Sequence, residues 1–243
     1  MNLRDDARVL WTLLRGQPGG ATHAERLDRF YGPQASRYDG FRERLLHGRD
    51  DLLSAVAAQL PAAGGRLIEL GAGTGRNLGY LSGRVDSLEV AELVDVCAPL
   101  LAQARRRWAG HDQVRVREAD ATRYRPERPM DAAYFAYALT MIPDWFEAVD
   151  NALRLLKPGG VLGVVDFYVS RPHPAPGLVR HGALARHFWP AWFGHDGVRP
   201  SPDHLPYLMG RLDVLRIEER RAPVPYLPGL RVPYYLFVGR KPG

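Results

Sequence analysis

Short apolar runs alternate along this chain with longer stretches in which apolar residues recur every three or four positions. The short runs, bounded by glycine, proline or acidic residues, predict strands. They lie at 66–70, 90–96, 114–118, 131–137 and 161–167, with two final runs at 212–220 and 234–239. The stretches between them predict helices. This alternation indicates an α/β fold with a doubly wound, seven-stranded, mostly parallel sheet whose last strand is antiparallel.

Both ends of the chain depart from this alternation. Residues 1–20 predict an N-terminal appendage helix, which a Gly-Gln-Pro-Gly-Gly break separates from the rest. Residues 21–243 predict one domain, in which mostly helical sequence over 22–60 forms a cap before the first strand. The stretch 168–210 is rich in proline, histidine and aromatic residues and is too long for an ordinary connection. We expect it to be an insertion or lid on the substrate side.

Composition narrows the class of protein. The 243 residues are 46% hydrophobic, enough for a packed core. No apolar stretch reaches the roughly 18 residues that predict a membrane span. The first residues alternate charged and apolar side chains and so do not predict a signal peptide. Cys97 is the single cysteine, which excludes an internal disulfide. We therefore expect a cytoplasmic protein.

The charge of the chain leaves its partner open. The formal net charge is +6 and the sequence pI is about 9.7. A basic surface attracts either nucleic acid or an anionic membrane face. An arginine-rich proteome gives the same balance, and only Lys157 and Lys241 of the 33 basic residues are not arginine. The charge therefore carries little weight by itself.

The segment 67–76, Leu-Ile-Glu-Leu-Gly-Ala-Gly-Thr-Gly-Arg, is the most informative in the chain. After the acid Glu69, three glycines stand at every second position: Gly71, Gly73 and Gly75. Glycines let the backbone lie against a ligand because no Cβ stands in the way. In open α/β sheets the ligand crevice lies at the carboxyl ends of the strands. A dinucleotide fingerprint needs a glycine at the sixth position of the loop, which is Arg76 here.

Two acids after the next strands extend the pattern to a whole nucleoside. Asp95 ends the second predicted strand, where an acid reaches ribose hydroxyls, and Val96 beside it is expected to line the same site. Asp120 follows the third strand and is expected to accept from the exocyclic amine of adenine, while the Ala121 N–H serves a ring nitrogen. The glycines and both acids together resemble the cofactor motifs of class I methyltransferases, which bind S-adenosylmethionine (SAM).

Two tyrosines are further candidates for the cofactor site. Tyr38 precedes an aspartate and looks like the tyrosine that closes over SAM in many class I methyltransferases. Tyr137, at the end of the fourth predicted strand, is expected to contact both the cofactor and the acceptor. Three arginines are unranked candidates for binding the methionyl carboxylate of SAM: Arg42, Arg44 and Arg49.

Further segments resemble the methyltransferase part of betaine lipid synthases, over residues 23–240. They lie at 38–49, which begins Tyr-Asp-Gly-Phe-Arg, and at 139–146, 165–171, 201–208 and 232–239. The resemblance implies a Rossmann-like fold and an N-methyltransferase that converts the amine of diacylglyceryl-homoserine to the trimethyl betaine lipid. It also implies a separate partner enzyme for the aminocarboxypropyl transfer, for which this chain is too short. Ala72 departs from the family, in which a further glycine is common.

The implied chemistry is displacement at the SAM methyl carbon by a neutral amine, for which the protein mainly supplies alignment. Asp166, at the carboxyl end of the fifth strand, is expected to orient the amine, although a structural aspartate fits equally. His204 or His187 is a candidate general base. Five aromatic residues are candidates for a box around the cationic product: Tyr137, Tyr168, Trp189, Trp192 and Tyr207. The histidine and acid spacings match no zinc pattern, so we expect no metal.

The residues leave other functions open. Nucleic-acid amino methyltransferases carry an acid-or-Asn-Pro-Pro-aromatic tetrad after the fourth strand, and 136–145 lacks it, so we expect no nucleic-acid partner. The acceptor is then a lipid headgroup, or a soluble small-molecule amine or hydroxyl. The same fold also transfers aminocarboxypropyl groups, and a non-catalytic SAM-binding module would share all cofactor residues. A lipid acceptor would make 168–210 a contact with the membrane surface, with the enzyme peripheral at the inner face.

Overall fold

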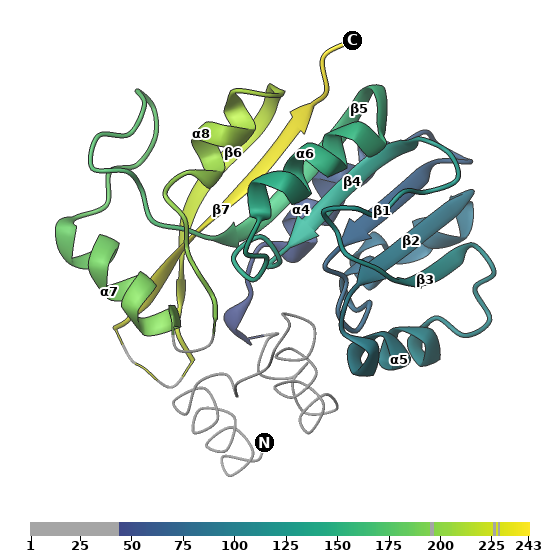
Figure 1. Cartoon of the computed structure of the whole chain (residues 1–243), viewed down its shortest axis with the longest axis horizontal. Helices are drawn as coiled ribbons and strands as arrows, with labels where there is room; N and C mark the ends of the chain where they lie inside the picture. Colours follow the sequence, from purple (N-terminus) through teal and green to yellow (C-terminus); the bar gives the residue numbers. More distant parts are fainter. Residues whose placement is uncertain (1–43, 195–196, 226, 228) are drawn as a thin grey trace.

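A seven-stranded sheet forms the centre of the protein (Figure 1). The computed structural model describes residues 44–243 apart from 195, 196, 226 and 228. The strands are β1 (Arg66–Leu70), β2 (Val90–Asp95), β3 (Val114–Glu118), β4 (Met130–Ala136), β5 (Leu156–Phe167), β6 (Asp213–Pro223) and β7 (Arg231–Arg240). Their order is β3-β2-β1-β4-β5-β7-β6. Strands β1 to β5 pair in parallel and β7 is antiparallel to both neighbours, which confirms the predicted fold class.

Helices cover both faces of this sheet (Figure 1). One face carries α4 (Arg49–Ala57), the 3-10 helix η2 (Asn77–Ser87), α5 (Ala98–Arg107) and α7 (Ala183–Gly194). The other carries α6 (Trp145–Leu155) and α8 (His204–Met209). In α4, Leu52, Leu53 and Val56 are fully buried against the core. Acidic residues in its first turn oppose the positive end of the helix dipole. Burial of one face therefore orients this helix on the sheet.

Several elements differ in detail from the predictions. The helix predicted after the glycine loop forms as a 3-10 helix, because Gly79 and Gly83 inside it lower α-helical propensity. Strand β4 ends one residue early because Tyr137 adopts a φ of 56°. Strand β5 begins at Leu156 rather than 161, because the chain pairs with β4 on both sides of an irregularity in the ladder.

Residues 168–210 are more regular than their sequence suggests. They contain α7, which buries Trp189 and Phe193 on one face of the sheet, and α8, which buries Leu205 and Leu208 on the other. The insertion therefore follows the carboxyl end of β5 and reaches both layers of helices. Its role as a lid stays a prediction.

Several predictions concern parts of the chain that the structure does not describe. The appendage helix over 1–20 and the cap segment before residue 44, with Tyr38 and Arg42, lie outside the described residues. Among the helices that are described, none combines the length and the apolar character needed to cross a bilayer.

Candidate functional site

The loop after β1 has the backbone shape that glycine allows. Gly71, Gly73 and Gly75 have φ angles of 79°, 54° and 66°, in the left-handed region. The Gly71 N–H donates to the Val94 carbonyl at 2.8 Å, which ties the loop to the end of β2. A Cβ added to Gly71 would lie 2.5 Å from the Cβ of Ala138, just after β4. The loop is therefore tightly enclosed by the ends of β1, β2 and β4.

Asp95, the last residue of β2, holds the same loop through its side chain. Its Oδ2 accepts the Gly73 N–H at 2.8 Å, and its Oδ1 accepts the Cys97 N–H at 2.9 Å. Hydrogen bonds to a carboxylate are charge-assisted and about twice as strong as neutral ones. Asp95 and its neighbour Val96 are both half-buried. The structure thus brings Asp95 and the glycine loop together, and the ribose contact stays a prediction.

A buried hydrogen-bond network lies beneath the loop and is centred on Glu69. Glu69 Oε1 accepts from Asn77 Nδ2 at 2.7 Å, and Oε2 accepts from the Tyr134 hydroxyl at 2.8 Å. Arg49 Nη1 donates in turn to Asn77 Oδ1 at 3.1 Å. All four side chains are buried. Burial raises the pKa of Tyr134 well above its ordinary value, and the Glu69 carboxylate adds to the shift. The network fixes the end of β1 against α4 and η2.

Sequence reasoning missed two members of this network, Asn77 and Tyr134, and left Arg49 unranked. A local signal existed for Asn77, which opens the segment directly after the glycine loop and eight positions after Glu69. No local signal existed for Tyr134, which comes from β4, or for Arg49, which comes from α4. Their contacts depend on the parallel pairing of β1 with β4 and on the docking of α4. Direct contact of Glu69 with the cofactor stays a prediction.

The loop after β3 is held in a compact turn by Asp120. Its Oδ1 accepts from both the N–H and the Oγ1 of Thr122, each at 2.8 Å. The Ala121 carbonyl accepts from Asn151 Nδ2 at 2.8 Å, which ties the turn to α6. Asp120 is exposed and Ala121 is buried. The turn lies at the same sheet edge as Asp95, because the carboxyl ends of parallel strands meet there. Adenine binding by Asp120 and Ala121 stays a prediction.

Tyr137 is strained and faces inward. Among the described residues it is the one non-glycine residue with positive φ, a conformation that clusters at functional sites. Its hydroxyl donates to the His47 carbonyl at 2.7 Å. Its ring meets the edge of Phe167, with 4.7 Å between centroids, and Phe167 stacks on Phe193 at 4.8 Å. Phe193 lies 5.7 Å from Trp189. We call these four residues the aromatic wall.

The predicted aromatic box does not assemble as one group. Tyr137 and Trp189 belong to the aromatic wall, on the α7 side of the sheet. Tyr168 and Tyr207 pack on the α8 side, and Trp192 is 38% exposed. The five aromatic residues therefore come from both faces of the sheet and from the surface of α7.

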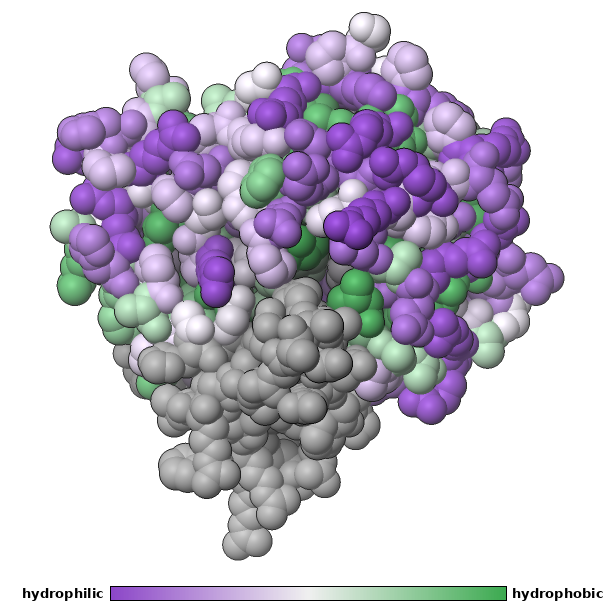
Figure 2. All heavy atoms as spheres, in the orientation of Figure 1, coloured by the Kyte–Doolittle hydropathy of each residue, from purple (hydrophilic) through white to green (hydrophobic). Residues whose placement is uncertain are grey.

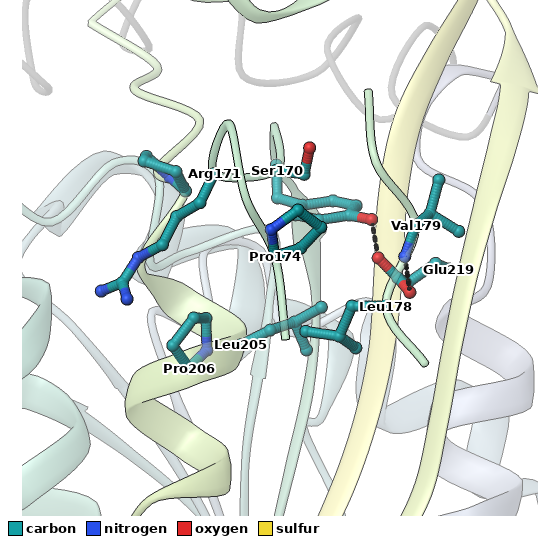
Figure 3. Close-up of a pocket in the computed structure, with 10 residues that line it drawn as sticks. Ser170, Arg171, Pro174, Leu178, Val179, Leu205, Pro206 and Glu219 are labelled. Carbon is teal, nitrogen blue, oxygen red and sulfur yellow. Dashed lines mark hydrogen bonds between the residues drawn. The ribbon is translucent and has the colours of Figure 1, made fainter. Parts of the chain in front are cut away.

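A small pocket lies beside Tyr168 on the α8 side (Figure 3). Leu178, Pro174 and Leu205 line its apolar part. The Tyr168 hydroxyl donates to Glu219 Oε1, and the Val179 N–H donates to Glu219 Oε2 at 2.8 Å. Burial raises the pKa of Tyr168 far above its ordinary value, with Glu219 contributing. These bonds fasten the insertion to β6.

Asp166 is fully buried at the carboxyl end of β5. Its Oδ1 accepts the Thr140 hydroxyl at 2.7 Å and the Phe167 N–H at 2.8 Å, and its Oδ2 accepts the Thr140 N–H at 3.1 Å. Burial raises the pKa of Asp166 to about 7, and the hydrogen bonds from Thr140 and Phe167 restrain that rise. The side chain thus anchors the loop after β4, and sequence reasoning missed its partner Thr140. Its role in orienting the amine stays a prediction.

His204 is also fully buried, at the start of α8. No described residue lies within hydrogen-bonding distance of either ring nitrogen, and the hydroxyl of neighbouring Tyr235 is likewise unpaired. The imidazole packs on Trp145, with 4.7 Å between ring centroids. Burial lowers the pKa of His204 to about 3. The role of general base stays a prediction that this burial disfavours, and His187 is exposed on α7.

Two opposite pH effects on stability are expected from these buried groups. The pKa of His204 falls on folding from 6.5 to about 3, so the unfolded state binds more protons below pH 6.5 and stability falls as pH falls. The pKa of Asp166 rises from 3.8 to about 7, so the folded state binds the extra proton and stability increases as pH falls through 7. We expect the two effects to oppose each other in wild type.

His204→Leu should remove the first effect and leave the second. We take the difference in free energy of unfolding between this variant and wild type above pH 7 as the reference. Below pH 6.5, this difference should grow in favour of the variant by about 1.4 kcal/mol per pH unit. Urea unfolding at about pH 5 and pH 7.5 measures the difference. His187→Leu, an exposed histidine on α7, is the matched control and should follow wild type. Parallel pH profiles for His204→Leu and wild type would contradict the prediction.

The described residues contain no group of three or more His, Cys, Asp or Glu side chains arranged to hold a metal ion. His195 and Asp196, two of the residues whose spacings match no zinc pattern, lie outside the described residues. The candidate site consists of the glycine loop, Asp95 at the end of β2, Asp120 after β3 and the aromatic wall.

Comparison with known proteins identifies relatives of this arrangement. A model of the methyltransferase-domain family matches residues 67–160. The chain is 34% identical over 151 residues to a demethylmenaquinone methyltransferase of Clavibacter sepedonicus, covering 61% of this chain and 59% of that protein. It is 35% identical over 149 residues to a demethylmenaquinone methyltransferase of Thermus thermophilus, covering 60% of this chain and 67% of that protein. The match thus spans less than two thirds of the Clavibacter relative.

Solved structures share the fold at low sequence identity. The N-methyltransferase NodS from Bradyrhizobium japonicum, in complex with S-adenosyl-L-homocysteine, matches with a TM-score of 0.59 and 16% identity, over 80% of this chain and 86% of that chain. This likeness establishes the fold. The family match ends before residue 168, so the insertion that supplies half of the aromatic wall lies outside it.

Proposed function

We propose, given that this chain belongs to the class I SAM-dependent methyltransferases, that it methylates the amine of a lipid headgroup. The acceptor that we favour is diacylglyceryl-homoserine, whose amine would receive three methyl groups. The observation that best supports methyl transfer is the hydrogen bond between the glycine loop and Asp95. The resemblance of 38–49, 139–146 and 201–208 to betaine lipid synthases supports the lipid amine. A separate enzyme would then supply the aminocarboxypropyl lipid.

The residues around this hydrogen bond fit SAM, the cofactor of this family. The loop offers backbone without side chains at Gly71 and Gly73, which supports close approach of the methionyl part. The half-buried Asp95 carboxylate is suited to accept from the two ribose hydroxyls. Asp120 is exposed at the same sheet edge, which supports its proposed contact with the adenine amine.

When bound, the cofactor supplies a methyl group that is activated by its bond to a positively charged sulfur. A neutral amine accepts this methyl group as the bond to sulfur breaks. The residues of the chain then have to align the two reactants, an effect worth up to about 7–11 kcal/mol. The hydrogen bonds between Thr140 and Asp166 hold the loop after β4 in one position for this purpose. Because Asp166 and His204 are fully buried, we propose that the amine loses its proton to water.

A second acceptor class is a demethylated quinone, the substrate in the names of both relatives. The sequence identity of 34% and 35% to these two relatives favours it. The family match does not include α7, which contributes Trp189 and Phe193 to the wall. The quinone acceptor of the relatives therefore cannot be assigned to this chain from the family match alone.

Mass spectrometry of lipid products tests the proposal directly. We expect purified protein with SAM and diacylglyceryl-homoserine in mixed micelles to yield mono-, di- and trimethylated lipid. A parallel reaction with a demethylmenaquinol tests the second acceptor. Methylation of the quinol alone, or of soluble amines or hydroxyls alone, would reject the lipid amine. A product that gains an aminocarboxypropyl group would show a different transfer, and SAM binding without any product would indicate a non-catalytic module.

A further inference from the structure

The outer face of α7 carries an apolar stripe whose two end residues are exposed and whose middle residue is half-buried. Leu184 is 83% exposed and Trp192 is 38% exposed. Phe188 lies between them, with 5.5 Å between its ring centroid and that of Trp192. The three residues recur every fourth position and so share one face of the helix. In Figure 2, green apolar side chains gather at the lower left, where Figure 1 draws α7. We call these three residues the α7 stripe.

The opposite face of α7 holds the helix on the sheet. Trp189 and Phe193 are 4% and 6% exposed. Phe193 stacks on Phe167 at 4.8 Å, at the carboxyl end of β5. Burial of Trp189 and Phe193 accounts for the position of the helix, and Phe188 also packs partly against the core. The core therefore does not require Leu184 or Trp192. An exposed group of large apolar residues on an anchored helix indicates a contact with another surface.

The charges around the α7 stripe identify the chemistry of that surface. The 23 residues 172–194 contain Arg180 and Arg186 and no aspartate or glutamate. Arg180 is exposed, whereas Arg186 is half-buried on the side of α7 away from Leu184 and Phe188 and donates to the His181 carbonyl at 3.3 Å. A basic segment that bears exposed leucine and tryptophan side chains is typical of helices that lie in the interface of an anionic bilayer. A tryptophan is also favoured at the boundary between headgroups and acyl chains.

We propose that the α7 stripe, with Arg180, docks this enzyme on a bilayer that carries anionic lipids. The docking would hold the aromatic wall, and with it the carboxyl ends of β4 and β5, close to the bilayer surface, because Phe193 connects α7 to Phe167 and Tyr137. A lipid headgroup would then reach the crevice while its acyl chains stay in the bilayer. In this respect the inference rests on the proposed lipid acceptor, although docking itself is independent of methyl transfer.

Vesicle flotation of the full chain, without SAM or acceptor, tests the docking surface. We expect the protein to float with phosphatidylcholine vesicles that contain phosphatidylglycerol, and to bind pure phosphatidylcholine vesicles much less. Leu184→Ser/Trp192→Ser should weaken binding at least about tenfold, since two apolar side chains no longer enter the bilayer. Arg180→Gln should weaken it about fivefold at low salt, and the difference should shrink at high salt.

Val214→Ser/Leu215→Ser is the matched control. Val214 and Leu215 are 45% and 43% exposed, close to the 38% of Trp192. They lie where β6 pairs with the last residues of β7, far from Phe167. This control should bind vesicles like wild type, and thermal unfolding verifies that every variant is folded. Equal binding by the α7 variants and the control would overturn the proposal. So would self-association that Leu184→Ser/Trp192→Ser abolishes without any vesicle binding by wild type. Vesicle binding without methylated lipid would leave docking standing and reject only the lipid acceptor.

Discussion

Gly71→Ala is expected to weaken SAM binding by at least about a hundredfold. An alanine at this φ of 79° would be strained by roughly 1–2 kcal/mol. Its Cβ would also lie 2.5 Å from the Cβ of Ala138, a backbone-fixed atom that cannot rotate away. Relief of an overpacked contact of this kind costs typically about 1–3 kcal/mol. The backbone would have to move, which would disturb the hydrogen bond from the Gly71 N–H to the Val94 carbonyl and hence the loop. Isothermal titration with SAM measures the loss.

Gly64→Ala separates strain from crowding. Gly64 has nearly the same φ, 72°, but an added Cβ would meet no atom within 4 Å. This variant should lose about 1–2 kcal/mol of unfolding free energy, measured in urea, and bind SAM like wild type. Wild-type affinity in Gly71→Ala would mean that the loop does not form the cofactor site. An equal loss of affinity in both variants would mean that general destabilisation, rather than the loop, causes it.

Asp95→Asn is the second change with a large expected effect. The carboxylate accepts the N–H groups of Gly73 and Cys97, and an amide retains only one of its two acceptor atoms. Hydrogen bonds to charged groups contribute roughly 1.5–3 kcal/mol each. Loss of one such bond within the site, together with the charge that we expect to face the ribose hydroxyls, should weaken SAM binding about 10- to 100-fold. The same titration measures the effect.

Asp112→Asn serves as the control for the loss of charge alone. Asp112 is exposed in the turn before β3, and the same change there should leave SAM affinity unaltered. If Asp95→Asn kept wild-type affinity, Asp95 would hold only the loop and the ribose contact would be wrong. If Asp95→Asn bound adenosine as wild type does but bound SAM more weakly, the defect would lie in the methionyl part of the site.

The glycine loop and Asp95 were accessible to sequence reasoning because both are local signals. The loop follows directly on a buried strand, and Asp95 marks the end of the next strand. The parallel order of β1 and β2 then brings them together, as the Gly73–Asp95 hydrogen bond demonstrates. The aromatic box was less accessible. Tyr137 directly follows β4 and Tyr168 directly follows β5, but the two residues pack on opposite faces of the sheet.

The two candidate catalytic residues, Asp166 and His204, are more buried than their predicted roles would require. Asp166 and His204 were candidates because their residue types suit proton transfer, yet both are fully buried. The pKa of each moves in the direction that favours the neutral form, since burial penalises charge. A sequence pattern reports which face of a strand is apolar. It does not report that His204, the first residue of α8, is buried, because that depends on how the insertion folds back on the sheet.

The sequence by itself determined the class of fold, the mostly parallel sheet whose strands alternate with helices along the chain, and the place of the cofactor loop. Those features follow from periodicity, from glycine at defined positions and from the handedness of strand–helix–strand units. Only the tertiary structure decided that Glu69 joins Arg49 and Tyr134 in one buried network and that α7 turns an apolar stripe outward. These features depend on contacts between residues far apart in the chain. The solvent exposure of a side chain is set by those neighbours and not by its own identity.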